Sequence, residues 1–312
     1  MMIAAERYTS GRIAVANLSA LIDRLHSSCT ERATFENLVV LSNLLFVRGD
    51  VLGRLADHDR AELVGIAAVG LSPDTGSALY IRARLAGRFH RFDQAKHLLD
   101  RALAAGYSAQ EIHGETAALL QATGHYREAL ALRERLAKAD PGIHTLGALA
   151  SLLAEMDDWA AAETCYAAAL DADTGVSPFP CGQLLFEWGV SATRRRDLDR
   201  AEEVFAELGA ILPEHVPARG HRAQVALARG QLEFAMELIA PVLQSSDDPE
   251  YLETQAEILA ALGESAAARE VQLTAAAAYE VLLARRPEAY AHHAARLLPH
   301  AHQVSFAFGG AA

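Results

Sequence analysis

Four histidines lie near the end of the chain, and clustered imidazoles are the ligands from which zinc and nickel sites are built. They are His292, His293, His300 and His302 in a chain of 312 residues. Pro299 is expected to end the helix that carries the first two, because proline interrupts helical hydrogen bonding. The other two are then poorly placed for a common helix face. We therefore predict a solvated end of the chain, with a metal-responsive or metal-delivering protein as an alternative.

Two Asp-Thr-Gly triplets, at residues 74–76 and 173–175, resemble the signature of aspartic proteases. That chemistry requires two carboxylates that share one proton at close range, held by β-rich lobes. Both triplets instead fall in turns between predicted helices, where Asp or Thr accepts a backbone N–H at the start of the next helix. The acidic run 245–250 is interpreted in the same way. Asp248 is expected to be an N-cap, with Pro249 as the first helical residue and Glu250 as a favourable first-turn charge.

The chain lacks the standard sequence motifs of enzymes. It contains no G-x-x-x-x-G-K-[ST] for phosphates, no G-x-G-x-x-G for dinucleotides, no H-E-x-x-H for zinc and no G-x-S-x-G for a serine nucleophile. We therefore predict that the protein is not an enzyme and has no catalytic residue, no cofactor and no metal site.

Charge and cysteine content restrict the partners and the compartment. The chain has 28 Lys and Arg against 40 Asp and Glu, a formal net charge of −12. Because phosphate binding needs a surplus of cations, we expect neither nucleic acid nor an anionic membrane as a partner. Three widely spaced cysteines and the lack of a long apolar run argue against a disulfide framework and a membrane span, so a cytoplasmic location is expected. The chain has only two lysines and is rich in Ala and Arg, and this composition is typical of a protein from a GC-rich bacterial genome.

A repeat of 33 or 34 residues dominates the sequence. Seven alanines follow one another at separations of 34, 34, 33, 39, 34 and 33 residues, and the residue twelve positions before each is Gly or Ala. Such a unit fits two helices of about 12–15 residues with short turns, and small residues let paired helices approach closely. The pattern therefore predicts an all-α protein built from helix pairs. The alanines are Ala61, Ala95, Ala129, Ala162, Ala201, Ala235 and Ala268.

Larger residues recur in the same register, and together they resemble the tetratricopeptide repeat (TPR). The pattern of that family places Trp or Leu, Leu-Gly, Tyr, Ala, Phe, Ala and Pro at fixed offsets. The resemblance covers roughly residues 42–280 as about seven units, and it implies a bacterial stand-alone member with a right-handed superhelical α-solenoid. The residues that carry it are Leu45, Leu79, Leu146, Leu185 and Leu252 in the first helix, Phe92, Tyr126 and Trp159 in the second, and Gly87, Gly124, Gly230, Gly263, Pro73, Pro141 and Pro213 in the turns.

We expect three segments along the chain. Residues 1–41 form an N-terminal capping segment with a helix at 13–26, residues 42–286 form the seven-unit solenoid, and residues 287–312 form a capping helix at 287–298 and a loose tail. An insertion at 171–182 explains the one spacing of 39. Pro178 and Pro180 are expected to exclude helix there, with Phe179 either packed on its neighbours or exposed as a docking side chain. Three residues depart from the aromatic column of the second helix, namely Gly65, Arg133 and Gln272.

The resemblance also implies a concave groove lined by the first helix of each unit. Its exposed positions are 2, 5, 9, 12 and 13, counted from unit starts at residues 42, 76, 110, 143, 182, 216 and 249. The first two units are aromatic and arginine-rich at these positions, and the last unit is acidic. Arg54, Arg84 and Arg88 are expected either to grip a carboxylate or phosphate or to pair with local acids such as Asp50. The predicted groove residues are Asn43, Phe46, Arg54, Tyr80, Arg84, Arg88, Gln121, Phe186, Arg194 and Gln224.

The predicted function is that of an adaptor or assembly scaffold. Its partner is expected to be another protein, bound in the concave groove through a peptide or helix that carries an acidic group. No membrane insertion is expected. A self-assembling homo-oligomer is a second alternative, since poorly capped solenoid ends associate and Phe306 and Phe308 lie near the tail.

Overall fold

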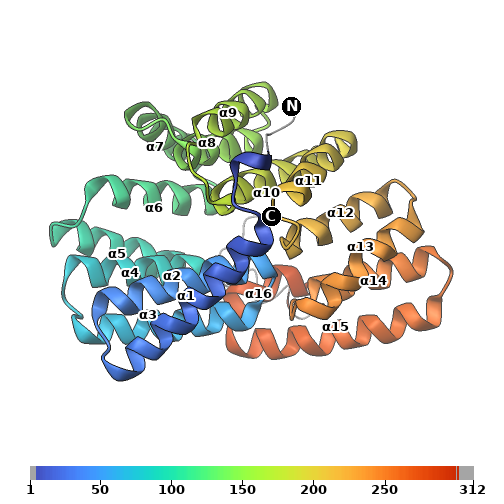
Figure 1. The fold of residues 1–312 in the computed structure, drawn as a ribbon, viewed down its shortest axis with the longest axis horizontal. Helices are drawn as coiled ribbons and strands as arrows, with labels where there is room; N and C mark the ends of the chain where they lie inside the picture. Colours follow the sequence, from blue (N-terminus) through green and yellow to red (C-terminus); the bar gives the residue numbers. More distant parts are fainter. Residues whose placement is uncertain (1–4, 300, 302–312) are drawn as a thin grey trace.

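A computed structural model describes residues 5–299 and 301 of the chain, and these residues fold almost entirely into helices (Figure 1). The predicted all-α solenoid is confirmed, and no strand occurs in the described part of the chain. A short 3-10 helix (Ala5–Arg7) and α1 (Gly11–Glu31) precede seven consecutive helix pairs, and α16 (Pro287–Ala294) follows them. The pairs are α2 (Phe35–Leu52) with α3 (Leu55–Leu71), α4 (Gly76–Arg88) with α5 (Phe92–Ala104), α6 (Ala109–Ala122) with α7 (Tyr126–Ala139), α8 (Ile143–Glu155) with α9 (Trp159–Ala172), α10 (Pro178–Arg194) with α11 (Leu198–Ile211), α12 (Val216–Ala228) with α13 (Leu232–Ser245), and α14 (Glu250–Ala261) with α15 (Ser265–Arg285).

The turn inside each pair contains one residue in the left-handed backbone conformation. Glycine, which adopts positive φ without steric penalty, supplies it in four pairs, and non-glycine residues supply it in the other three. Gly87, which the sequence pattern placed in a turn, lies inside α4, and His90 takes the left-handed position instead. The seven residues are Gly53, His90, Gly124, Asp157, Arg196, Gly230 and Gly263.

The small-residue columns of the repeat lie where paired helices touch. All seven alanines that define the period are at most 4% exposed, so each is enclosed by its neighbours. The Gly or Ala twelve residues earlier is buried in every unit as well. A Cβ added at Gly189 would collide with the ring of Phe205 in the partner helix. Small residues are therefore required by close helix packing.

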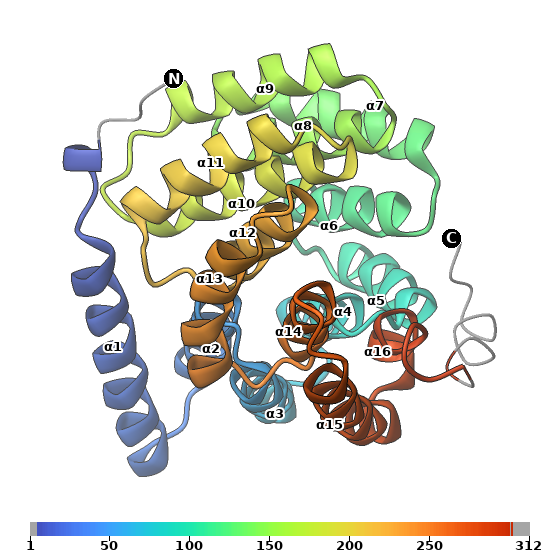
Figure 2. The same ribbon diagram turned by 90° about the vertical axis from the view of Figure 1, so that its right-hand side faces the viewer.

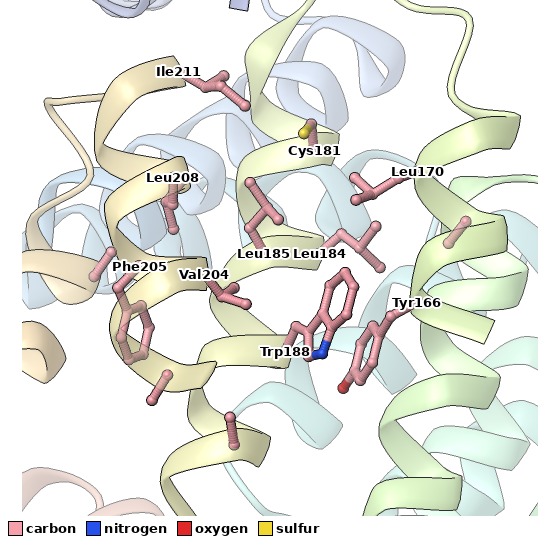
Figure 3. Close-up of a cluster of buried hydrophobic side chains, with 14 of the residues drawn as sticks. Tyr166, Leu170, Cys181, Leu184, Leu185, Trp188, Val204, Phe205, Leu208 and Ile211 are labelled. Carbon is pink, nitrogen blue, oxygen red and sulfur yellow. The ribbon is translucent and has the colours of Figure 1, made fainter. Parts of the chain in front are cut away.

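The largest hydrophobic cluster fills the middle of the solenoid, between α9, α10 and α11 (Figure 3). Tyr166 and Trp188 stack with ring centroids 5.0 Å apart, and Leu184, Phe205 and neighbouring side chains close around them. The Tyr166 hydroxyl lies 3.1 Å from Ser191 Oγ, and Trp188 Nε1 donates to Glu163 at 2.7 Å. The two large rings therefore have partners for their polar atoms.

The first pair begins earlier than the sequence pattern indicated. Thr34 accepts a hydrogen bond from the Asn37 amide at 3.2 Å, so α2 begins at Phe35, ahead of the expected unit start at residue 42. The preceding helix, expected at 13–26, is longer at both ends and spans Gly11–Glu31. It packs on α2 through Leu18 and Ile22.

The expectation that prolines exclude helix from 171–182 is wrong. Pro178 occupies the first turn of α10, where a missing N–H leaves no bond unmade, and the extra residues lengthen that helix at its N-terminus. Phe179 is half-buried and packs against the clusters around α1, α2 and α10, as one of the two alternatives predicted. The segment before α10 is held by the N-terminus, because Tyr8 donates to Asp173 at 2.9 Å and the Thr9 amide donates to Val176 O at 2.8 Å.

The two Asp-Thr-Gly triplets differ in role. Thr75 Oγ1 accepts from the Ala78 amide at 3.2 Å and caps α4, as predicted. Asp173 does not cap α10. Its carboxylate instead accepts from Tyr8 and from the Gly175 amide, because Pro178 starts the helix further along the chain.

At the C-terminal end, α16 stops at Ala294, short of the expected 298. Asp248 accepts from the Glu250 amide at 3.0 Å as an N-terminal cap, but the helix begins at Glu250 rather than at Pro249. The described residues contain no group of three or more His, Cys, Asp or Glu able to hold a metal ion. Four residues named above, His300, His302, Phe306 and Phe308, lie outside the described part of the chain.

The seven pairs curve into an arch whose ends meet (Figures 1 and 2). A Cβ at Gly53, after α2, would lie 3.2 Å from Val216 at the start of α12. The Ser246 hydroxyl, between α13 and α14, donates to the Gly53 carbonyl. The last units of the solenoid therefore lie against the first. None of the helices in the described residues is both long and apolar enough to cross a membrane.

Candidate binding groove

One cavity lies among the first helices of the first three pairs. It has a volume of about 560 Å³ and is bordered by α2, α4, α6 and the α4–α5 turn. Its walls are mostly apolar, with two arginines and two acids among them. Four of the predicted groove residues meet here. They are Asn43 and Phe46 from α2 and Arg84 and Arg88 from α4.

Both cavity arginines contact groups on neighbouring helices. Arg84 donates to Asn43 Oδ1 at 3.2 Å, and its Nε lies 3.2 Å from Glu115 Oε1. Arg88 pairs with Asp50 and lies 3.1 Å from His58 Nε2. The predicted alternative of pairing with local acids is what the structure shows. The two guanidinium side chains are each 41% exposed, so these pairs are weak and open to exchange with an incoming anion.

Asp50 links the cavity to α3, because it contacts both Arg88 and His58. Burial favours its neutral form, but hydrogen bonding to His58 and the charge of Arg88 outweigh burial, and the pKa of Asp50 is lowered. Asp50 is therefore ionised at neutral pH and holds the cavity edge of α4 through Arg88.

Two of the predicted residues lie apart from this cavity. Arg54 is the exposed N-cap of α3 and does not border it, so the expected group of three arginines is a pair. Tyr80 is buried, stacks on Tyr107 with centroids 4.5 Å apart and donates to Glu115 Oε1 at 3.4 Å. It borders a second cavity, of about 360 Å³, between α4, α6 and α8.

The other predicted residues are distributed along the rest of the groove. Gln121 borders a third cavity of about 310 Å³ between α6, α8 and α10. Arg194 is exposed and pairs with Glu155 at 3.4 Å. Phe186 lies 5.2 Å from the rings of His215 and His221, and Gln224 donates to Glu250 and Thr254. These residues lie on α6, α10 and α12 and do not form one site.

The sequence pattern missed two charged groups in the middle of the groove. Arg133 of α7 borders the second and third cavities, and its Nε is buried without a hydrogen-bond partner. Burial lowers the pKa of Arg133, and burial raises the pKa of Glu187, which borders the third cavity. Neither forms an ion pair within the described residues. A carbonyl oxygen is the kind of acceptor that Arg133 Nε lacks, whereas Glu187 Oε1 already accepts a hydrogen bond from Gln183 Nε2 at 2.9 Å.

One position of the repeat accounts for several cavity residues that the sequence pattern did not predict. The sixth position of each of the first five units borders one of the three cavities, although the expected groove positions skip it. Arg133 has a separate signal, since it stands where the repeat expects an aromatic ring. The sixth-position residues are Val47, Ile81, Glu115, Ala148 and Glu187.

The buried thiols show no sign of activation. Cys181 is fully enclosed in the main cluster, and burial raises its pKa to about 11. Burial also raises the pKa of Cys165. Since the thiolate is the nucleophile, a raised pKa lowers the reactivity of both side chains at neutral pH.

Comparison with known proteins agrees with this architecture. A tetratricopeptide-repeat sequence profile matches residues 192–258, from the end of α10 into α14. This match and the seven helix pairs around it give the chain the architecture of a tetratricopeptide-repeat (TPR) protein. The first helix of each early pair faces the cavities. A search of curated protein sequences found no match.

Several solved structures share the fold at low sequence identity. A Rap protein complexed with Competence and Sporulation Factor is 14% identical over 95% of this chain and 98% of that one, with a TM-score of 0.55. PilW, a widely conserved type IV pilus biogenesis factor, is 19% identical over 68% of this chain and 94% of its own, with a TM-score of 0.52. Yeast Tom70 is 16% identical over 80% of this chain and 50% of its own, with a TM-score of 0.51.

Proposed function

We propose that this TPR protein is a non-catalytic adaptor that binds a segment of another protein in its concave groove. The observation that carries the proposal is the 560 Å³ cavity, which combines an apolar wall with two half-exposed arginines. The volume lies in the range of cavities that hold side chains or small ligands. A protein of similar fold, the Rap protein, was solved in complex with Competence and Sporulation Factor, which supports a binding role.

The preferred partner segment carries an acidic side chain beside an apolar one. The acidic group replaces Asp50 or Glu115 as the partner of Arg88 or Arg84, and guanidinium groups bind carboxylates through two parallel hydrogen bonds. The apolar side chain fills the cavity beside Phe46. Existing ion pairs at this exposure contribute about 1 kcal/mol or less each, so their exchange for a well-oriented carboxylate costs little.

A random-peptide display library selected on the wild-type protein provides the probe for this proposal. Selected peptides are labelled and titrated by fluorescence anisotropy. We expect Arg84→Ala/Arg88→Ala to weaken binding by at least about tenfold, since each hydrogen bond to a charged group is worth about 1.5–3 kcal/mol. Arg54→Ala is the matched control, because this arginine lies outside the cavity.

A second variant tests the cavity without removing charge. Ala118→Leu adds bulk to the cavity wall and is expected to weaken the same peptides. Equal affinity of wild type and both variants, with circular dichroism showing intact helices, places the binding surface elsewhere and overturns the proposal.

A further inference from the structure

The last helix pair is joined to the first by a helix cap whose two partners lie 192 residues apart in the sequence. Both carboxylate oxygens of Asp247 accept backbone hydrogen bonds at the start of α3, from Leu55 N at 2.6 Å and Ala56 N at 3.0 Å. The first amides of a helix have no partner within it, so such a cap is usually supplied by a neighbouring residue. Here it comes from the loop between α13 and α14.

Two arginines at the end of α15 form the second part of the joint. Arg286 pairs with Asp59 and lies 2.7 Å from Glu62, both on α3, and Arg285 lies 3.5 Å from Asp59. The Arg286 guanidinium also lies 3.9 Å from the centre of the Phe89 ring. Burial opposes the charge of Arg286, but hydrogen bonds to Glu62 and Asp59 outweigh it and raise the pKa of Arg286. The joint therefore remains charged at neutral pH.

This joint is polar, whereas the other contact that closes the arch is apolar. The end of α2 packs on units five and six through buried apolar groups, since Val51 belongs to the main hydrophobic cluster. The clusters of the last pair and α16, by contrast, include no residue of α2–α5 within the described part of the chain. The last pair is thus held on α3 by ion pairs and one cap, without a shared core.

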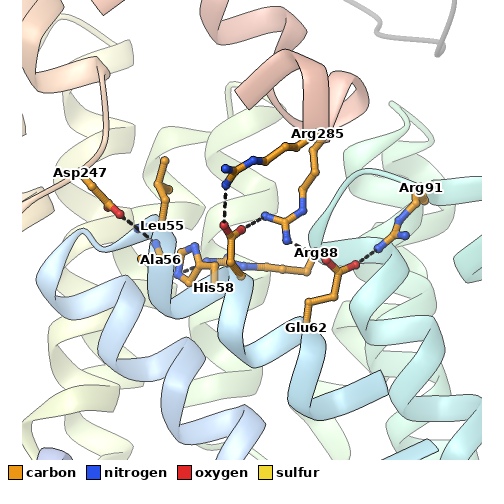
Figure 4. A network of polar contacts seen from close by, with 10 residues as sticks. Leu55, Ala56, His58, Glu62, Arg88, Arg91, Asp247 and Arg285 are labelled. Atoms are coloured by element: carbon orange, nitrogen blue, oxygen red, sulfur yellow. Dashed lines mark hydrogen bonds and ion pairs between the residues drawn. The ribbon is translucent and has the colours of Figure 1, made fainter. Parts of the chain in front are cut away.

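The joint is continuous with the edge of the cavity (Figure 4). Glu62 binds Arg286 on one side and Arg91, at the start of α5, on the other. On the next turn of α3, His58 lies 3.1 Å from Asp50, the partner of Arg88. The His90 ring, which borders the cavity, lies close to the backbone of Glu288 in α16.

From this geometry we propose that the last helix pair with α16 is a latch on the groove. Closed, it holds α3 and the α4–α5 turn at the cavity edge and completes the arch around the inner surface. Opening at the polar joint admits a polypeptide segment to the cavity. This inference rests on the proposed function for its biological meaning, but its physical content is tested without any partner.

A single cysteine in the cavity measures access to it. The three native cysteines are replaced by Cys29→Ser, Cys165→Ser and Cys181→Ala, and Ala118→Cys supplies the reporter on the cavity wall. The latch variant is Arg285→Ala/Arg286→Ala. Its matched control is Arg127→Ala/Arg269→Ala, two exposed arginines that form no ion pair in the described part of the chain. Each protein reacts with a polymer-linked maleimide and with N-ethylmaleimide.

The latch variant should react faster with the bulky reagent alone. Loss of three ion pairs, of which the two of Arg286 are partly buried, raises the open population by at least about tenfold, and the rate of bulky labelling rises with it. The rate with N-ethylmaleimide should remain within about twofold of the parent, because that reagent is small enough to enter the closed arch. An unchanged bulky rate, or an equal rise with both reagents, overturns the latch.

Two further measurements keep the test decisive. Amide exchange at Leu55 and Ala56 should accelerate in Asp247→Ala, and small-angle X-ray scattering should show a larger radius of gyration for the latch variant. If the double variant is unfolded, Asp59→Asn, which removes a partner of both arginines, takes its place.

The display-selected peptides connect the latch to binding. Their association rate should rise by about tenfold in the latch variant, matching the bulky labelling. Opening without faster association overturns gating but leaves the proposed function intact. If peptide affinity is unchanged in Arg84→Ala/Arg88→Ala, the proposed function is wrong. The labelling rates still show whether the last pair acts as a latch.

Discussion

Arg48 and Asp57 form a buried ion pair between α2 and α3, with two hydrogen bonds of 2.7 and 2.6 Å. Removing one partner leaves a buried charge without compensation. We expect Arg48→Met to lower the free energy of unfolding by about 3–5 kcal/mol, measured by urea denaturation. Arg60→Met is the control, since Arg60 is largely exposed and 4.0 Å from the same carboxylate. Arg48→Met/Asp57→Leu should recover much of the loss, and a double variant no better than Arg48→Met contradicts this account.

His215 is fully buried and caps α12, with Nδ1 accepting from the Ala218 amide at 3.1 Å. Burial lowers the pKa of His215 to about 4, and the nearby charge of Asp50 opposes this while His221 adds to it. The pKa of His215 in the folded protein is below its unfolded value near 6.5. Neutral His215 therefore makes its full contribution to the free energy of unfolding above pH 6.5, and this contribution is lost as the pH falls toward 4. The loss amounts to about 3 kcal/mol.

Urea unfolding across that pH window tests the assignment. His215→Asn keeps the capping acceptor but cannot take up a proton, so its stability should vary less with pH than that of wild type. His26→Asn, at an exposed histidine, should leave the pH dependence as it is. Parallel pH profiles for wild type and His215→Asn would show that His215 is not responsible.

The register of the repeat located part of the groove. Asn43, Phe46, Arg84 and Arg88 were named from the repeat register and meet in one cavity. Arg54 was named by the same register but lies outside, because the α2–α3 turn places its left-handed residue at Gly53 rather than three residues later as in the other units. Partner choice, such as Arg84 with Glu115, depends on the distance between helices, which the register does not contain.

At the scale of helices, the small-residue columns set how closely two helices pack. Gly189 on α10 faces the Phe205 ring on α11, and an added Cβ would collide with it. We expect Gly189→Ala to lower the free energy of unfolding by about 1–3 kcal/mol through overpacking. Gly209→Ala on α11 is the control, because nothing lies within 4 Å of a Cβ there and Ala should stabilise that helix by about 0.5–1 kcal/mol.

The helices were predictable because their signals repeat. The period and the small-residue columns recur in each unit, and turn glycines recur in four of the seven pairs, so a single ambiguous position is corrected by the others. The departures occur where the signal is local. Pro178 reads as a helix breaker but is equally suited to a first helical turn, and only the length of chain left for the connection decides between the two roles. His90, Asp157 and Arg196 take the left-handed position without any glycine to mark it.

At the scale of the molecule, closure of the arch has no signature in the repeat. Each unit encodes contacts with its neighbours, and a small rotation per unit accumulates until the last pair reaches the first. The residues that form the joint then read as ordinary surface charges. Asp247 looked like part of a local capping loop, and its carboxylate caps a helix 192 residues earlier in the chain.

Closure changes how the solenoid should unfold. An open array of repeats frays from its ends, whereas a joint between the first and last units ties both ends to the middle. Both tryptophans, Trp159 and Trp188, lie in central units, so their fluorescence reports the middle while far-ultraviolet circular dichroism reports all helices. In wild type the two urea transitions should coincide.

In Arg285→Ala/Arg286→Ala the terminal units lose their tie and should unfold first. The circular dichroism transition then begins at lower urea than the tryptophan transition, with a smaller apparent slope. Arg127→Ala/Arg269→Ala should keep the two transitions together. Coincident transitions in both variants would mean that the apolar contact of α2 with units five and six, rather than the polar joint of the last pair, couples the ends of this solenoid.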